Sequence, residues 1–153
     1  MAVVGGDDDE VAQAIWTKKD MGCNMNGNTT VTVYDDTYTD PKPSYSIKFH
    51  RPSALPINFA VSIVNKSSLP SNISTLIKDA IISAFSGGDG GERARIAGTI
   101  YASRFYAPVA MAHSAVSILS VQVGTTTANL TSVTAGIDQY PTVDPDDITV
   151  TLI

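Results

Sequence analysis

The side chains of this sequence that could do catalytic chemistry are two histidines and a single cysteine. His50 and His113 lie far apart in the chain, and Cys23 lies in a polar, glycine-containing stretch. A nucleophilic cysteine works with a neighbouring histidine, but none of the local sequence signatures of such pairs is present. The serine elbow G-x-S-x-G, the zinc motif H-E-x-x-H and the C-x-x-C pair are absent as well. We therefore predict that the chain is not an enzyme and has no catalytic residues.

Two acidic clusters supply carboxylate oxygens, which are ligands that Ca²⁺ prefers. Residues 7–9 are all aspartate, and Asp144, Asp146 and Asp147 form the second cluster. The spacing of a calcium-binding loop, with its distal glutamate, is absent. The first cluster is typical of a helix cap and the second of a solvated turn, so we predict neither a metal site nor a bound cofactor.

The glycine-rich run GGDGG at residues 87–91 resembles a loop that holds phosphate groups. A phosphate-binding loop follows a strand and continues into Gly-Lys-Ser or Gly-Lys-Thr, whereas this run follows a predicted helix and lacks those residues. We therefore interpret it as a helix C-cap and a mobile linker.

Composition excludes several classes of protein. The chain has 153 residues, of which 43% are hydrophobic and 16% charged, which is typical of a folded protein. The net charge of −5 and the scattered lysines and arginines argue against binding to nucleic acid. No apolar run is long enough to span a bilayer, so no membrane insertion is expected. The single cysteine excludes an internal disulfide and suits a protein made in a reducing compartment.

The first part of the chain is predicted to form a helix and a β-hairpin. Asp7 is placed to cap the helix, Glu10 can complete a capping box, and Gly22 with the asparagines after it stops the helix. Alternating residues then predict strands at residues 29–34 and 45–49. Residues 51–56 contain two prolines and are predicted to be an extended linker, which separates residues 1–53 from residues 54–153.

The second part contains one strongly periodic helix. With Ser71 as N-cap, it is predicted to run to about Ser86, because apolar residues recur at helical spacing. Those residues are Ile73, Leu76, Ile77, Ala80, Ile81, Ala84 and Phe85. A shorter helix is predicted over residues 98–107, limited by Pro108. Strands are predicted at residues 57–64, 92–97, 115–123, 132–137 and 148–153, with a proline-containing loop at residues 140–147.

These elements predict an α+β fold in two subdomains. Residues 1–53 are expected to form a small helix and β-hairpin subdomain. It would be part of a longer parent domain, because Met1 is followed at once by an apolar tripeptide and the acidic cap. Residues 54–153 are expected to form a compact α/β sandwich of antiparallel strands with two helices on one face.

Aromatic and arginine side chains are the candidates for contacts with other proteins, because such residues dominate the binding energy of interfaces. We single out Trp16, Arg104, Phe105, Tyr106 and Tyr140. The Ser-Arg-Phe-Tyr segment at residues 103–106 is the least explained by packing, and Arg104 is a candidate bridge to a neighbouring chain. For each aromatic residue the alternative is a place in the core or at its edge.

Three stretches of the sequence form an ordered series. Residues 5–35 combine a glycine and acidic helix start with a glycine and asparagine turn, and then the strand motif V-x-V-x-D at Val31, Val33 and Asp35. Residues 45–64 hold a strand followed by Arg51 and Pro52, and residues 100–153 end in an acidic, proline-containing loop and a terminal strand. This series resembles the C-terminal part of the baseplate J-like proteins of contractile-tailed phages, the Mu-like baseplate wedge family.

The resemblance implies a structural component of a contractile phage or prophage tail baseplate, a wedge assembly protein whose family pattern contains no catalytic residues. Its partners would be other baseplate or tail proteins and further copies of itself. Its expected location is the virion, after synthesis in the bacterial cytoplasm. Members of the family are longer, so the chain would lack an N-terminal portion. The alternative is a tail-associated binding module that recognises a surface glycan or a peptide.

Overall fold

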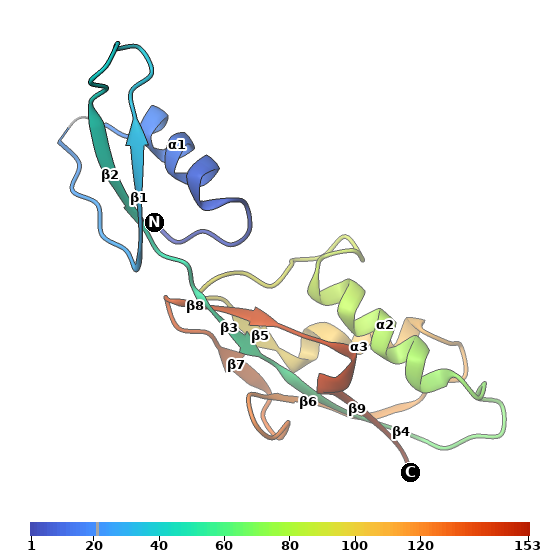
Figure 1. Cartoon of the computed structure of the whole chain (residues 1–153). Coiled ribbons are helices and arrows are strands. Elements are labelled where there is room, and N and C mark those ends of the chain that lie inside the picture. The colour runs from blue at the N-terminus through green and yellow to red at the C-terminus, as the bar shows by residue number, and fades with distance from the viewer. Residues whose placement is uncertain (21) are drawn as a thin grey trace. The chain divides into compact units, whose positions relative to one another are not determined.

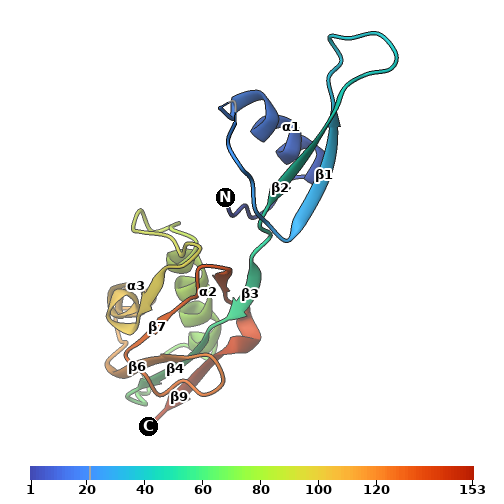
Figure 2. The ribbon, with the colours of Figure 1, turned by 90° about the vertical axis from the view of Figure 1, so that its left-hand side faces the viewer.

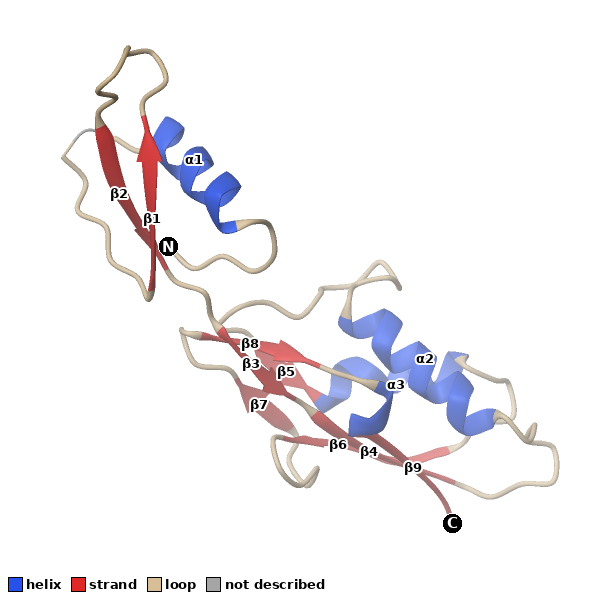
Figure 3. Cartoon of the chain, in the orientation of Figure 1, coloured by secondary structure: helices blue, strands red, loops and turns tan. Residues whose placement is uncertain are grey.

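Figure 1 shows the computed structural model, which describes residues 1–20 and 22–153. The chain divides into two compact units, Met1–Ser53 and Ala54–Ile153, which we call unit 1 and unit 2. Each unit combines helix with antiparallel or mixed sheet (Figure 3). The predicted α+β class is therefore confirmed.

Unit 1 begins with a capped helix, α1 (Asp8–Lys18). The Asp7 carboxylate accepts hydrogen bonds from the amides of Asp9 (2.9 Å) and Glu10 (3.4 Å). These bonds satisfy amides of the first turn, which have no partner within the helix. An aspartate at the N-cap position is expected to make such bonds. The predicted N-cap at Asp7 is confirmed, but in the described residues no bond from the Asp7 amide to the Glu10 carboxylate completes the predicted capping box.

A β-hairpin packs against α1 in unit 1. Strands β1 (Thr29–Tyr34) and β2 (Ser44–Phe49) pair antiparallel, with Thr29 opposite Phe49. Alternate residues of the hairpin face the helix, because side chains alternate between the two faces of a strand. The buried core of this unit consists of Ala12, Val33, Ile47 and Phe49. Both predicted strands are confirmed.

The sheet at the centre of unit 2 is mixed. Strand β4 (Asn58–Ile63) lies between β6 (Ile118–Gly124), which is antiparallel to it, and β9 (Ile148–Leu152), which is parallel (Figure 2). The sequence predicts these three strands, and it predicts that all of them are antiparallel. The second prediction is wrong for β9, which is parallel to β4. The amide of Ile57, just before β4, donates to the carbonyl of Thr142 (2.9 Å). The chain therefore returns to the end of the sheet where β4 starts, and β9 runs in the same direction.

Two helices, α2 (Ile73–Phe85) and α3 (Tyr106–Met111), pack against this sheet and against each other. Every second residue of β4 is buried against them, and the apolar stripe of α2 supplies the facing side chains. The prediction of Ser71 as N-cap is wrong, because Asn72 occupies that position and its side chain makes no capping hydrogen bond. Here packing of the apolar stripe, and not a side-chain cap, sets where the helix begins.

Two segments predicted to be a linker and a loop form strands. β3 (Ser53–Pro56) pairs with β8 (Gln139–Thr142), although both contain a proline. When only one side of a strand is paired, a proline whose missing N–H faces the other side costs no ladder hydrogen bond. The short helix η2 (Pro145–Asp147) follows, with Pro145 in its first turn, where the missing N–H costs nothing either.

The helix predicted over residues 98–107 is also wrong. The chain forms a strand, β5 (Thr99–Tyr101), then the 3-10 helix η1 (Ala102–Phe105), and then α3. Pro108 lies in the first turn of α3 and does not limit a helix before it. Strand β5 pairs with β7 (Ser132–Thr134), which is shorter than predicted.

Two other predicted strands also need correction. The strand predicted at residues 92–97 does not form. There Ala97 has a positive φ of 56°, which breaks an extended conformation. Strand β6 begins at Ile118, later than the predicted residue 115, because a turn closes from the amide of Val116 to the carbonyl of His113 (3.0 Å).

Candidate functional site

The five residues predicted to contact other proteins lie in different surroundings. Trp16 is half-buried in unit 1, where its ring lies 5.7 Å from that of Tyr45. Tyr140 is half-buried in β8 of unit 2. Neither ring is fully available at the surface, and the two belong to different units.

Phe105 lies in the core and not on the surface. Its side chain is 3% exposed, and its ring centroid lies 4.8 Å from that of Phe59 and 6.3 Å from that of Phe85. The edge-to-face packing on Phe59 is a favoured aromatic geometry. The prediction that Phe105 contacts another protein is therefore wrong, because its side chain is buried. The tight turn of η1 directs this side chain into the core.

Tyr106 is 40% exposed but has a partner within the fold. Its hydroxyl oxygen accepts a hydrogen bond from the amide of Val121 in β6 (3.2 Å). That amide faces away from β4, so the tyrosine satisfies a backbone group at the sheet edge. Part of the role of Tyr106 is therefore internal.

Arg104 forms an ion pair within unit 2. Its Nη2 lies 2.6 Å from Oδ1 of Asp89, and both side chains are less than a third exposed. This hydrogen bond holds the pKa of Asp89 below its ordinary value of 3.8, and the amide of Gly91, which donates to the same oxygen (3.0 Å), acts in the same direction. The bond likewise raises the pKa of Arg104. The guanidinium is engaged inside the unit, where the sequence predicts a bridge to a neighbouring chain.

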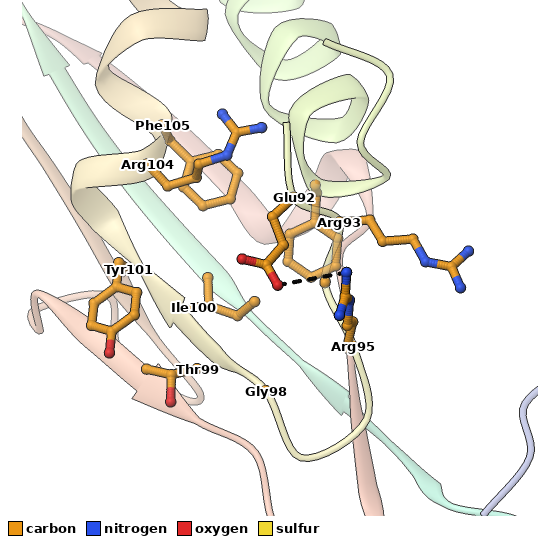
Figure 4. A pocket seen from close by; sticks show the side chains of 11 residues that line it. Glu92, Arg93, Arg95, Gly98, Thr99, Ile100, Tyr101, Arg104 and Phe105 are labelled. Atoms are coloured by element: carbon orange, nitrogen blue, oxygen red, sulfur yellow. Dashed lines mark ion pairs between the residues drawn. The ribbon is translucent and has the colours of Figure 1, made fainter. Parts of the chain in front are cut away.

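Arg104 and Phe105 also line a pocket of about 300 Å³ in unit 2 (Figure 4). Phe85, Ile100 and Phe105 give it an apolar wall. Arg93, Arg95 and Arg104 supply positive charge, so three of the four arginines of the chain gather here. The pocket therefore combines apolar surface with a basic rim in a protein whose net charge is negative.

The arginines of this pocket differ in their partners. Arg104 is held by Asp89, whereas the nearest carboxylate oxygen of Glu92 lies 3.7 Å from Arg95 and both side chains are largely exposed. An exposed pair at this distance contributes little. Arg93 has no ion pair with any residue that the structure describes. Two of the three cationic groups are thus available to an anionic ligand.

Sequence reasoning missed Arg93, Arg95 and the β5 residues of this pocket. The alternation Arg-Ala-Arg at residues 93–95 carries a signal, because in an extended segment both arginines point to one side. Nothing local shows that this segment meets β5 and the end of α2. That meeting is made by the hydrogen bond from the amide of Ala94 to the carbonyl of Phe85 (2.9 Å).

The residues considered for catalysis and metal binding are separate or structural. His113 accepts a hydrogen bond at Nδ1 from the amide of Ala115 (3.1 Å), the backbone of His50 bridges to Ala2, and Cys23 is an exposed thiol. Asp7 caps α1, and Asp144 with Asp147 forms a capping box on η2. Within residues 1–20 and 22–153, no three side chains of His, Cys, Asp or Glu converge as a metal site would require.

The fold and the pocket define a two-unit α+β protein with a basic, partly apolar site in its second unit. In the described part of the chain, every helix is too short or too polar to cross a bilayer. A scan against protein-family models and a search of curated proteins each found no match.

Proposed function

We propose that this chain is a structural component of a contractile phage or prophage tail baseplate, a wedge assembly protein that acts in the virion through protein–protein contacts. Support from the sequence comes from the ordered series of three stretches that resembles the Mu-like baseplate wedge family. The proposed partners are other baseplate or tail proteins and further copies of this chain. No catalytic step is part of the proposal.

The small core of unit 1 is the observation that carries this proposal. Among the described residues of that unit, the buried hydrophobic side chains are Ala12, Val33, Ile47 and Phe49. One helix on one hairpin buries a modest share of its surface, and such units commonly need further support. A unit built in this way suits a protein whose surfaces are covered in an assembly.

Unit 1 also exposes aromatic residues where its hairpin turns. Tyr34 ends β1, Tyr38 lies in the connection, and Tyr45 lies near the start of β2, with exposed fractions of 56%, 58% and 40%. Tyrosine is enriched among residues that dominate the binding energy of interfaces. This end of the hairpin is therefore the proposed contact surface of unit 1.

Capture of partners from a lysate tests the proposal. The purified, tagged chain is incubated in lysate of cells that produce a contractile-tailed particle, and captured proteins are quantified by mass spectrometry. We expect tail proteins in stoichiometric amounts. The double variant Tyr34→Ser/Tyr38→Ser should reduce their capture about tenfold, because it removes two exposed rings from the contact. Met111→Ser, which removes a side chain that is 85% exposed on unit 2, serves as the matched control.

If the tagged chain captures no tail protein even at high protein concentration, the assembly role is overturned. The alternative is a tail-associated module that binds a surface glycan or a peptide, and the pocket of unit 2 is the observation that favours it. A glycan that binds only the folded protein would raise its melting temperature, so a thermal-shift screen separates the two functions.

A further inference from the structure

In the described part of the chain, strand β5 is paired along one edge, with β7, and its other edge is unpaired. The hydrogen bonds to the β7 side join the amide of Ala135 to the carbonyl of Gly98 (2.9 Å) and the amide of Ala102 to the carbonyl of Thr131 (2.8 Å). Because backbone groups alternate along an antiparallel ladder, the amides of Thr99 and Tyr101 face the opposite side. Within residues 1–20 and 22–153, no strand pairs with that side of β5.

The pocket of unit 2 lies along this unpaired edge. Thr99, Ile100 and Tyr101 all line it, although successive residues of a strand point to opposite faces. A cavity bordered by residues of both faces runs beside the strand and not over one face of it. The segment of residues 92–95 forms the other side of the pocket (Figure 4).

The segment of residues 92–95 brings two positive charges to the pocket, because Arg93 and Arg95 both line it. In Figure 4 the Arg95 side chain lies beside the carboxylate of Glu92, whereas the Arg93 side chain extends away from this pair and from β5. The shortest distance between Arg95 and Glu92 is 3.7 Å, from Nη2 to Oε1. Both arginines are exposed, and the exposed pair of Arg95 with Glu92 contributes little free energy. A carboxylate of a ligand can therefore replace Glu92 beside Arg95 with little loss of stability. Of the acidic side chains, Glu92 lines the pocket, and Asp89 is held by Arg104, which also lines it.

We propose that this pocket binds an acidic, extended segment of a partner polypeptide, which adds as a strand to the free edge of β5 and places its carboxylates on Arg95 and Arg93. The unpaired edge offers both amides, which donate, and carbonyls, which accept, at Thr99 and Tyr101. A polypeptide backbone supplies the acceptors and the donors that pair with them, whereas an ionised phosphate group supplies acceptors alone. The arginines select for acidic side chains, because a guanidinium binds a carboxylate with charge-assisted hydrogen bonds. The apolar wall at Ile100 accepts an alternate aliphatic side chain of the same strand.

This inference rests on the proposed assembly role only for the source of the segment, which would be another protein of the assembly. The chemistry of the pocket stands apart from that source. The experiment therefore uses a defined peptide and does not depend on any tail protein.

The probe is a fluorescein-labelled peptide of alternating glutamate and valine, blocked by an amide at its C-terminus. Its binding to the full chain is measured by fluorescence anisotropy. We expect saturable binding that weakens about tenfold in Arg93→Glu/Arg95→Glu, because two attractions become repulsions. Lys48→Glu, the reversal of one positive charge on an exposed residue of unit 1, should leave the affinity unchanged. Arg93→Gln/Arg95→Gln should weaken it less, and it replaces the reversed variant if that variant does not fold.

Two further peptides separate the parts of the proposal. Replacing every glutamate by glutamine should weaken binding about as much as Arg93→Gln/Arg95→Gln does, because each change removes the charge attraction without adding a repulsion. Methylating the backbone nitrogens at alternate positions should abolish binding in one register and spare it in the other, because only one set of amides faces β5. Equal binding of the glutamine peptide, equal binding of both methylated peptides or no saturable binding would overturn the inference.

The failures of the two proposals are distinguishable. If tail proteins are captured equally by the wild type and by Arg93→Glu/Arg95→Glu, and the probe does not bind, the pocket has no such role and the assembly function stands. If the probe binds with the expected pattern and no tail protein is captured, the peptide site stands and the assembly function fails.

Discussion

Arg104 Nη2 and Asp89 Oδ1 meet at 2.6 Å, and this ion pair joins the glycine-rich loop at residues 87–91 to η1. Gly87 ends α2 with a φ of +80°, as a C-cap glycine does. Gly91 lies so close to the guanidinium that a Cβ there would overlap it. The loop that the sequence predicts to be a mobile linker is thus fastened at its middle, beside the pocket.

Replacing Asp89 by asparagine should change how the stability of unit 2 depends on pH. The pKa of Asp89 is lower in the folded chain than its ordinary value of 3.8. The pair therefore stabilises the fold fully above that value, and the contribution is lost as the pH falls through the folded-state pKa. We expect Asp89→Asn to be less stable near neutral pH and to lose less stability on acidification. Urea unfolding followed by circular dichroism at each pH measures this.

Asp36→Asn is the control for that experiment. Asp36 pairs with Lys42 in unit 1 at the same distance of 2.6 Å, but its side chain is 80% exposed. Solvent screens such a pair, so its removal should change stability little at any pH. If wild type and Asp89→Asn lose stability in parallel on acidification, the assigned role of the Arg104 pair is wrong.

Phe105 and Tyr106 are neighbours that should respond differently to substitution. Phe105→Ala removes a ring from the aromatic core and should cost about 3–5 kcal/mol of unfolding free energy. Tyr106→Phe removes only the hydroxyl that accepts from the amide of Val121 and should cost about 0.5–1.5 kcal/mol. Urea unfolding of both variants measures the difference. A cost for Phe105→Ala as small as that of Tyr106→Phe would contradict its place in the core.

Local patterns explain why some elements could be predicted. β1 and β2 alternate apolar and polar residues, and α2 repeats apolar residues at helical spacing, because each buries one side of a single regular element. Asp7 shows its role by residue type alone, since a carboxylate before a helix can accept from the first free amides. In these cases the sequence pattern and the structure depend on the same few neighbouring residues.

The remaining elements depend on contacts between distant residues. β3 and β8 are short and contain prolines, and each becomes a strand only because the other lies beside it. The same holds for β5, which is three residues long and pairs with β7. Arg104 could be singled out from the sequence, but its partner Asp89 could not. The pocket likewise requires α2, the segment at residues 92–95 and β5 to meet, and no local spacing encodes that meeting.

Arg51 is a further residue whose role only the structure shows. Its guanidinium donates to the carbonyls of Val3 (3.2 Å), Gly5 (2.7 Å) and Gly6 (2.8 Å), and to Oδ1 of Asp8 from both Nε (2.9 Å) and Nη2 (2.7 Å). It also lies over the ring of Phe49, 5.1 Å from the centroid. A single side chain thus ties the segment before α1 to the end of the hairpin. The planar fork of arginine makes these simultaneous bonds in a way that lysine cannot.

Arg51→Lys should therefore destabilise unit 1 by about 1–3 kcal/mol, since several carbonyls and a carboxylate lose their donors. Trp16 is the only tryptophan of the chain and packs on Tyr45, so its fluorescence during urea unfolding reports unit 1. Arg95→Lys, the same change in a side chain that is 66% exposed, should leave that transition unchanged. An Arg51→Lys transition at the wild-type urea concentration would show that the fork is dispensable and that α1 docking alone holds unit 1 together.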